Sequence, residues 1–192
     1  MADENSDAYQ AAGVDVAQAE NALTRITKRL RTPWPESGPG RVALDFGKYA
    51  NIVELAGGQG LAICADGVGT KALIAQMLGK YDTIGIDCVA MNVNDLVCVG
   101  AKPLSLVDYI AVERTDPTVL DQISIGLTDG AVQSGASIPG GEIAEMPGVI
   151  TGWKPGLGFD LAAMATGTVA LDAVNVGADV APGDVVVGIG SN

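Results

Sequence analysis

The sequence predicts a fold of the α+β or α/β class, in which helices pack against a mixed sheet. Short apolar runs typical of strands alternate along the chain with longer segments of helical periodicity. Gly-rich turns separate these elements, and the 192 residues include 26 glycines. With 48% hydrophobic residues, the chain can bury a core and is not disordered.

The first predicted helix spans residues 15–30. Asp15 can cap its N-terminus, and apolar residues recur at helical spacing as far as Leu30. Lys28 lies in the last turn, where the helix dipole favours a cation. The simplest interpretation of the basic residues in this turn is therefore a solvated helix end.

Asp66-Gly-Val-Gly-Thr-Lys71 is the most informative motif. It follows the apolar run 61–65 and precedes the helical pattern of residues 73–78. Such a turn can hold a phosphate, because glycines allow close approach and the N–H groups of a helix start point toward an anion. Asp66 can hold a divalent cation, and Lys71 adds a positive charge. The alternative is a purely structural strand-to-helix turn, and the motif is not a Walker A loop.

Residues 83–99 are predicted to form a mostly apolar helix that carries four short polar side chains. Such side chains are costly to bury unless they are paired, so the pattern favours a cation or nucleotide site over a core. The four residues are Asp87, Asn92, Asn94 and Asp95.

The rest of the chain continues the alternation. Strands are predicted over residues 104–112, which include Asp108, and over residues 161–170, which follow Asp160. Asp116-Pro117 is a good start for the helix between them.

Residues 139–148 indicate a loop that carries two acids, either a surface loop or a functional one. Residues 149–158 are rich in Gly, Pro and Trp and are expected to be mobile. We assign residues 1–170 to one domain, and residues 171–192 to a linker and the first strand of a second, truncated domain.

Composition excludes several classes of function. The net charge of −12 argues against a nucleic acid or an anionic membrane as partner, and no apolar run approaches the roughly 18 residues of a membrane-spanning helix. Cys64, Cys88 and Cys98 lie in apolar runs without CxxC spacing, which predicts buried free thiols in the cytoplasm. The absence of histidine excludes His-dependent triad or zinc chemistry within these residues.

Four motifs together resemble the aminoimidazole ribonucleotide synthetase family, the phosphoribosylformylglycinamidine cyclo-ligases. They are Tyr9 with residues 12–15, then residues 66–71, 85–95 and 140–148, and their order and spacing match over residues 9–190. The resemblance implies an N-terminal ATP-binding domain whose sheet is completed as a barrel when two copies form a homodimer. The wider superfamily includes selenophosphate synthetase, thiamine monophosphate kinase and formylglycinamidine ribonucleotide synthetase.

The resemblance also implies a reaction. ATP phosphorylates the formyl amide oxygen of formylglycinamidine ribonucleotide, and the amidine nitrogen then attacks the activated carbon to close the imidazole ring. ADP and phosphate are released. Such phosphoryl transfer depends on positioning and charge neutralisation more than on a covalent protein group.

Roles for individual residues follow from their place in the motifs. The resemblance implies that Asp66 and Asp95 hold Mg²⁺ and that Lys71 and Glu142 are catalytic, with Glu142 facing the substrate or a metal. The residues implied near ATP are Lys28, Gly67, Gly69, Thr70, Lys71, Asp87, Asn92 and Asn94.

The chain departs from the family pattern at two places. Ile143 stands where the family usually has Thr, and the sequence ends at Asn192, before the family's His-Ser-Asn-Gly stretch and second α/β domain. Two alternatives therefore remain open. One is a non-catalytic nucleotide-binding or dimerisation module, and the other is a different ATP-dependent member of the superfamily, such as a small-molecule kinase.

Overall fold

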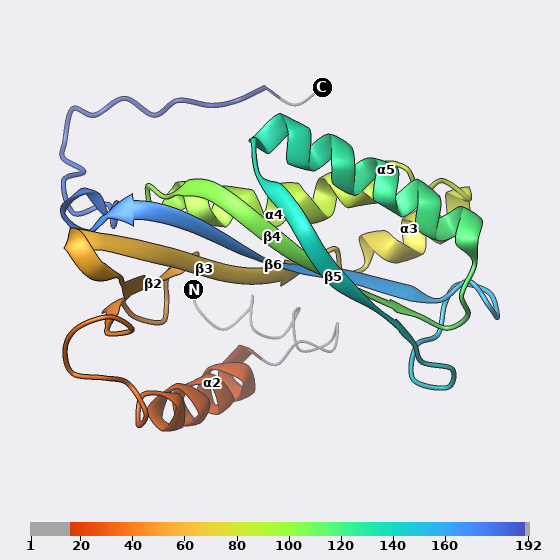
Figure 1. Ribbon diagram of the computed structural model, residues 1–192, viewed down its shortest axis with the longest axis horizontal. Coiled ribbons are helices and arrows are strands. Elements are labelled where there is room, and N and C mark those ends of the chain that lie inside the picture. The colour runs from red at the N-terminus through yellow and green to blue at the C-terminus, as the bar shows by residue number, and fades with distance from the viewer. Residues whose placement is uncertain (1–15, 191–192) are drawn as a thin grey trace, which may run out of the picture.

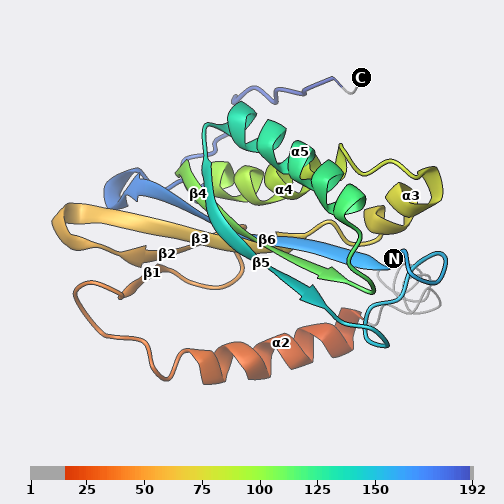
Figure 2. The same ribbon diagram turned by 45° about the vertical axis from the view of Figure 1, so that its right-hand side comes forward.

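The computed structural model describes residues 16–190, which form a six-stranded sheet with helices on both sides (Figures 1 and 2). The elements are α2 (Val16–Leu30), β1 (Val42–Leu44), β2 (Asn51–Glu54), η1 (Ala56–Gly58), β3 (Gln59–Gly67), α3 (Lys71–Leu78), α4 (Ile84–Cys98), β4 (Lys102–Val112), α5 (Pro117–Ser134), β5 (Ser137–Glu145), β6 (Phe159–Ala170) and η2 (Leu171–Ala173). Both views show α3, α4 and α5 on one side of the sheet and α2 on the other.

The strand order of the sheet is β1-β2-β3-β6-β4-β5. Neighbouring strands are antiparallel except β4 and β5, which are parallel and are connected through α5, because a parallel pair needs a crossover. Strands β3, β4 and β5 consequently end at the same end of the sheet, where β6 begins. The loops at this end bring together segments that are far apart in the sequence.

The core lies between the sheet and helices α4 and α5. Alternate residues of β6, beginning with Phe159, are buried toward these helices. The two helices approach closely where Gly85 of α4 meets α5, since a Cβ atom on Gly85 would lie 2.2 Å from the backbone nitrogen of Leu127. This packing holds α4 over β3 and β6, so that the predicted site residues of α4 lie near Asp66 at the end of β3.

The opposite side of the sheet, which we call the open face, carries exposed apolar side chains. In strands β4 and β6 they are Val107, Tyr109 and Met164. Helix α2 lies on this side, and its own apolar residues Leu23, Ile26 and Leu30 are also exposed. An exposed apolar face of this kind is typical of a surface that binds another protein chain.

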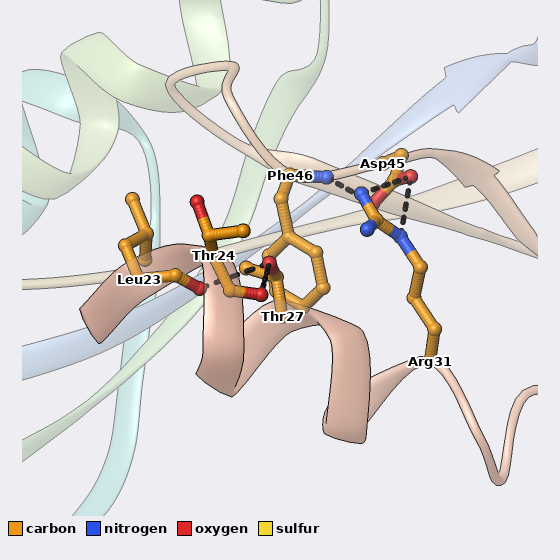
Figure 3. Close-up of polar contacts among 6 residues, drawn as sticks. All are labelled: Leu23, Thr24, Thr27, Arg31, Asp45 and Phe46. Atoms are coloured by element: carbon orange, nitrogen blue, oxygen red, sulfur yellow. Dashed lines mark hydrogen bonds and ion pairs between the residues drawn. The ribbon is translucent and has the colours of Figure 1, made fainter. Parts of the chain in front are cut away.

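Arg31 attaches the C-terminal end of α2 to the segment after β1. Its guanidinium lies 2.8 Å from the Asp45 carboxylate and 5.5 Å from the centre of the Phe46 ring (Figure 3). Within the helix, Thr27 is buried and its hydroxyl donates a hydrogen bond to the carbonyl of Leu23 (Figure 3).

Several predicted elements are confirmed. The helix predicted over residues 83–99 is α4, and the strands predicted over residues 104–112 and 161–170 are β4 and β6. Asp116 caps α5, because its carboxylate accepts hydrogen bonds from the backbone N–H groups of Thr118 and Val119.

Other predictions were wrong. Most of the predicted loop 139–148 belongs to strand β5, because pairing with β4 outweighs the low strand propensity of Pro139 and the two glycines. Cys98 is exposed, whereas Cys64 and Cys88 are buried as expected.

Two of the predictions concern residues near the ends of the chain. Residues 184–190 form no strand in this structure, so their assignment to a second domain stays a prediction. The predicted cap Asp15 and the motif of residues 9–15 lie outside the described residues. In the described part of the chain, no helix combines the length and the apolar character needed to cross a membrane.

Candidate phosphate-binding site

Residues 66–71 join the end of β3 to the start of α3. Gly69 has a φ of 58°, which favours glycine, and the N–H group of Gly67 donates a 2.7 Å hydrogen bond to Asp66 Oδ1. Among residues 16–190, the backbone N–H groups of Gly69 and Thr70 find no acceptor, and Thr70 makes no side-chain cap bond. The turn can therefore offer two N–H groups to an anion at a helix N-terminus.

The side chain of Asn92 fixes this turn through hydrogen bonds to the backbone of Asp66. Its side chain is fully buried, and its Oδ1 accepts the N–H of Asp66 at 3.0 Å while its Nδ2 donates to the carbonyl of Asp66 at 3.2 Å. Nδ2 also donates to the carbonyl of Cys88 at 2.9 Å. Asn92 thus fixes the end of β3 to α4. This role differs from direct contact with a nucleotide, which the burial of its side chain prevents.

Asp66 and Asp95 form the acidic part of the site. Burial, with a smaller contribution from the negative charge of Asp66, raises the pKa of Asp95. The negative charge of Asp66 disfavours the ionised form of Asp95, and a divalent cation bound by both carboxylates would relieve this repulsion. In the described residues, no set of three or more His, Cys, Asp or Glu side chains is arranged to hold a metal. Two carboxylates suit Mg²⁺, which usually completes its shell with water and phosphate oxygens.

Lys71 lies at the first position of α3 and forms an ion pair with Asp87 of α4, with Nζ 3.0 Å from Oδ1. The pair borders a groove of about 180 Å³ between the two helices, which is also lined by Ile74 and Ile84. Both charged side chains are about half exposed, so solvent screens the pair and Lys71 can also reach an anion at the turn.

The structure does not bring every predicted residue to this turn. Asn94 lines a different groove, between α4 and α5, because it is one residue and about 100° around the helix from Asp95. Glu142 pairs in register with Tyr109 and lies on the open face, and its carboxylate accepts the N–H of Ile143. Lys28 belongs to α2, on the same side as Glu142.

Sequence reasoning gave no role to Asp108, which the sheet aligns with Asp66. Asp66 pairs with Ala163, Ala163 with Asp108, and Asp108 with Gly141, so these residues form one row across four strands. Paired residues point to the same face, and Ala163 is buried against the helices. Burial raises the pKa of Asp108, which lines a hollow over Gly140 and Gly141. Its only signal in the sequence is an acid within an apolar strand.

Comparison with known families agrees with this fold. A model of the family described as "AIR synthase related protein, N-terminal domain" matches residues 47–169, and the chain belongs to this family. The phosphoribosylformylglycinamidine cyclo-ligase of Methanobrevibacter smithii is 44% identical over 184 residues, covering 96% of this chain and 51% of that protein. The cyclo-ligase of Thermococcus kodakarensis is 46% identical over 186 residues, with 96% and 54% covered. The chain therefore spans about half the length of the curated relatives it matches.

Solved structures share the fold at much lower identity. One described as AaThiL complexed with AMPPCP and TMP has a TM-score of 0.58 at 14% identity, covering 78% of this chain and 41% of the other. PurLQS from Thermotoga maritima has a TM-score of 0.55 at 18% identity, covering 69% and 22%. At these identities the similarity establishes the fold alone.

Proposed function

We propose that this chain is the N-terminal, ATP-binding part of a phosphoribosylformylglycinamidine cyclo-ligase. The whole enzyme would use ATP to close formylglycinamidine ribonucleotide into 5-aminoimidazole ribonucleotide, releasing ADP and phosphate in the cytoplasm. The names of the relatives at 44% and 46% identity support this activity. The observation that carries the proposal is the turn 66–71, which places free N–H groups, a cation and a carboxylate together.

The residues of the turn have separate roles in this proposal. The N–H groups of Gly69 and Thr70 bind phosphate oxygens, and Lys71 adds positive charge where Asp87 orients it. Asp66 and Asp95 would hold Mg²⁺, which neutralises phosphate charge when it is bound. The structure with AMPPCP shows that a protein of this fold binds an ATP analogue.

The open face suits the homodimer that the proposal includes. Val107, Tyr109 and Met164 are exposed on it, and pairing with a second copy would cover them. Glu142 and Lys28 lie on this same side. We therefore place both residues near the dimer interface, where they would contribute to a site formed by two copies.

The domain division forms part of the proposal. Residues 1–170 would be the ATP-binding and dimerisation domain, and residues 171–192 would lead into the second half of the enzyme. The length of the relatives supports this division. The side chains of Val185, Val186, Val187 and Ile189 are 83–98% exposed, and a second domain would cover them.

Nucleotide binding and ADP release test the proposal. We expect the purified chain to bind Mg²⁺-AMPPCP by equilibrium dialysis, and Lys71→Met to weaken binding about tenfold or more, because a hydrogen bond to a charged group contributes about 1.5–3 kcal/mol. Lys80→Met is the matched control, since Lys80 forms a similar exposed ion pair with Asp82 at 2.7 Å. It should bind like the parent.

The substrate decides between the open alternatives. ADP release that depends on formylglycinamidine ribonucleotide would support the cyclo-ligase. Binding without release would indicate a module that needs its second half, whereas release with another acceptor alone would indicate a small-molecule kinase. A chain that binds no nucleotide would contradict the proposed site.

A further inference from the structure

Two segments distant in the sequence lie side by side where β3 ends. Residues 68–81 contain α3, and residues 152–161 lead into β6. They contact each other at three places, which lie before, within and after α3. The contacts are the hydrogen bond from Val68 N–H to the Leu161 carbonyl (2.9 Å), the hydrogen bond from Trp153 N–H to Gln76 Oε1 (2.7 Å), and the edge-to-face rings of Tyr81 and Phe159 (5.8 Å between centres).

Gln76 makes the second of these three contacts, the one within α3. Its side chain is only 5% exposed, and its Oε1 accepts the backbone N–H of Trp153. Its Nε2 is buried and has no partner anywhere in the described chain. A buried donor without an acceptor costs about 1–3 kcal/mol. Stability alone therefore does not account for a glutamine at this position.

Residues 152–158 form a loop around Trp153, and its two ends, Gly152 and Gly158, lie close together. A Cβ atom on Gly152 would lie 2.5 Å from Gln76 Oε1 and 2.5 Å from the backbone nitrogen of Gly158, so only glycine fits there. At the other end of the loop, the N–H of Gly158 donates a hydrogen bond to Glu113 Oε2 at 3.1 Å. Trp153 itself is 55% exposed. The loop was expected to be mobile from its composition. Hydrogen bonds hold it where its two ends meet, and the indole of Trp153 is exposed to solvent.

We propose that Gln76 is a positioning residue that couples the turn 66–71 to the Trp153 loop. The proposal rests on the proposed function, because a nucleotide must bind at the turn. Lys71 and Gln76 lie five residues apart on one short helix, about 7.5 Å along its axis. A helix moves as a unit, so a shift of its first turn on binding phosphate carries Gln76 and the amide of Trp153 with it.

Trp153 fluorescence reports this coupling directly. The sequence has two tryptophans, and Trp34→Phe leaves Trp153 as the single fluorophore. We expect saturating Mg²⁺-AMPPCP to change the Trp153 emission in this background. Gln76→Met keeps the length of the side chain but replaces the amide oxygen with a thioether, which accepts a hydrogen bond only weakly, so it should lose most of the change. Equilibrium dialysis on the same samples shows separately whether the nucleotide is bound.

Two more variants separate coupling from folding. Gly152→Ala disturbs the same contact from the loop side and should also lose the signal, whereas Met77→Gln changes the neighbouring exposed position on α3 and should keep it. Hydrogen exchange of the Trp153 amide should be faster in Gln76→Met than in the parent, with or without nucleotide, because this amide loses its acceptor.

The outcomes are distinct. A parent that binds nucleotide without any change in Trp153 emission overturns the coupling and leaves the proposed function intact. A full signal in folded Gln76→Met overturns it as well. A parent that binds no nucleotide by dialysis overturns the proposed function, and the coupling with it.

Discussion

The side chain of Asn92 binds both backbone polar groups of Asp66, accepting its N–H at 3.0 Å and donating to its carbonyl at 3.2 Å. A strand end normally has a neighbouring strand for such bonds. In this chain a helix side chain supplies them, and the carboxylate of Asp66 instead accepts the N–H of Gly67. The geometry of the turn 66–71 therefore depends on a side chain that is fully buried.

Replacing Asn92 should be costly to stability. Asn92→Ala leaves the N–H and carbonyl of Asp66 without their buried partner, which we expect to lower the free energy of unfolding by about 2 kcal/mol or more. Asn94→Ala, two residues along the same helix but exposed, should change it by about 0.5 kcal/mol or less. Urea unfolding of both variants measures the difference. Equal losses would mean that the bonds to Asp66 do not stabilise the fold.

The adjacent glycines of β5 should respond differently to the same substitution. A Cβ atom on Gly141 would lie 2.6 Å from the backbone oxygen of Asp108, whereas one on Gly140 would meet nothing within 4 Å. We therefore expect Gly141→Ala to destabilise the protein by about 1–3 kcal/mol through overpacking. Gly140→Ala should be close to neutral in the same unfolding experiment. A large loss for Gly140→Ala would show that the strand is packed differently.

Local signals in the sequence predicted the helices and three of the six strands, β3, β4 and β6, whereas the short strands β1 and β2 were not predicted. The alternation of apolar residues in β6 and the Asp116-Pro117 start of α5 need only neighbouring residues to be recognised. Strand β5 was missed because Pro139, Gly140 and Gly141 disfavour a strand, and only pairing with β4 reveals it. The Pro/Gly loop after it was expected to be mobile from its composition, and the hydrogen bond that holds it is not visible in the sequence because Gln76 and Trp153 are 77 residues apart.

The candidate site was predictable in part for the same reason. The turn 66–71 is contiguous, so the sequence shows it directly. Whether Asp95 or Asn94 faces the turn depends on the rotation of α4, which the exposed and buried residues of a mostly apolar helix do not define. Glu142 lies on the open face because it pairs with Tyr109 of β4. This register cannot be read from the sequence of either strand alone.

The three free cysteines should differ sharply in reactivity. Burial and the nearby charge of Asp95 raise the pKa of Cys64 to about 11, and burial with the charge of Asp108 raises that of Cys88 to about 12. Cys98 is exposed. Because the thiolate is the reactive form, we expect Ellman's reagent to label one thiol quickly in the native chain and all three after denaturation. Cys98→Ser should remove the fast phase, and a fast phase that persists would show that a buried thiol is accessible.

Asp108 should make stability depend on pH. Burial raises its pKa above the ordinary aspartate value of 3.8, so the folded state binds this proton more tightly than the unfolded state. The resulting stabilisation is fully present below about pH 3.8 and is lost as the pH rises through the raised value. Asp108→Asn cannot ionise, so we expect it to gain stability relative to the parent as the pH rises, up to a plateau near neutrality. Urea unfolding from acidic to neutral pH measures the difference. A difference that is constant with pH would show that the Asp108 carboxyl titrates alike in the folded and unfolded states.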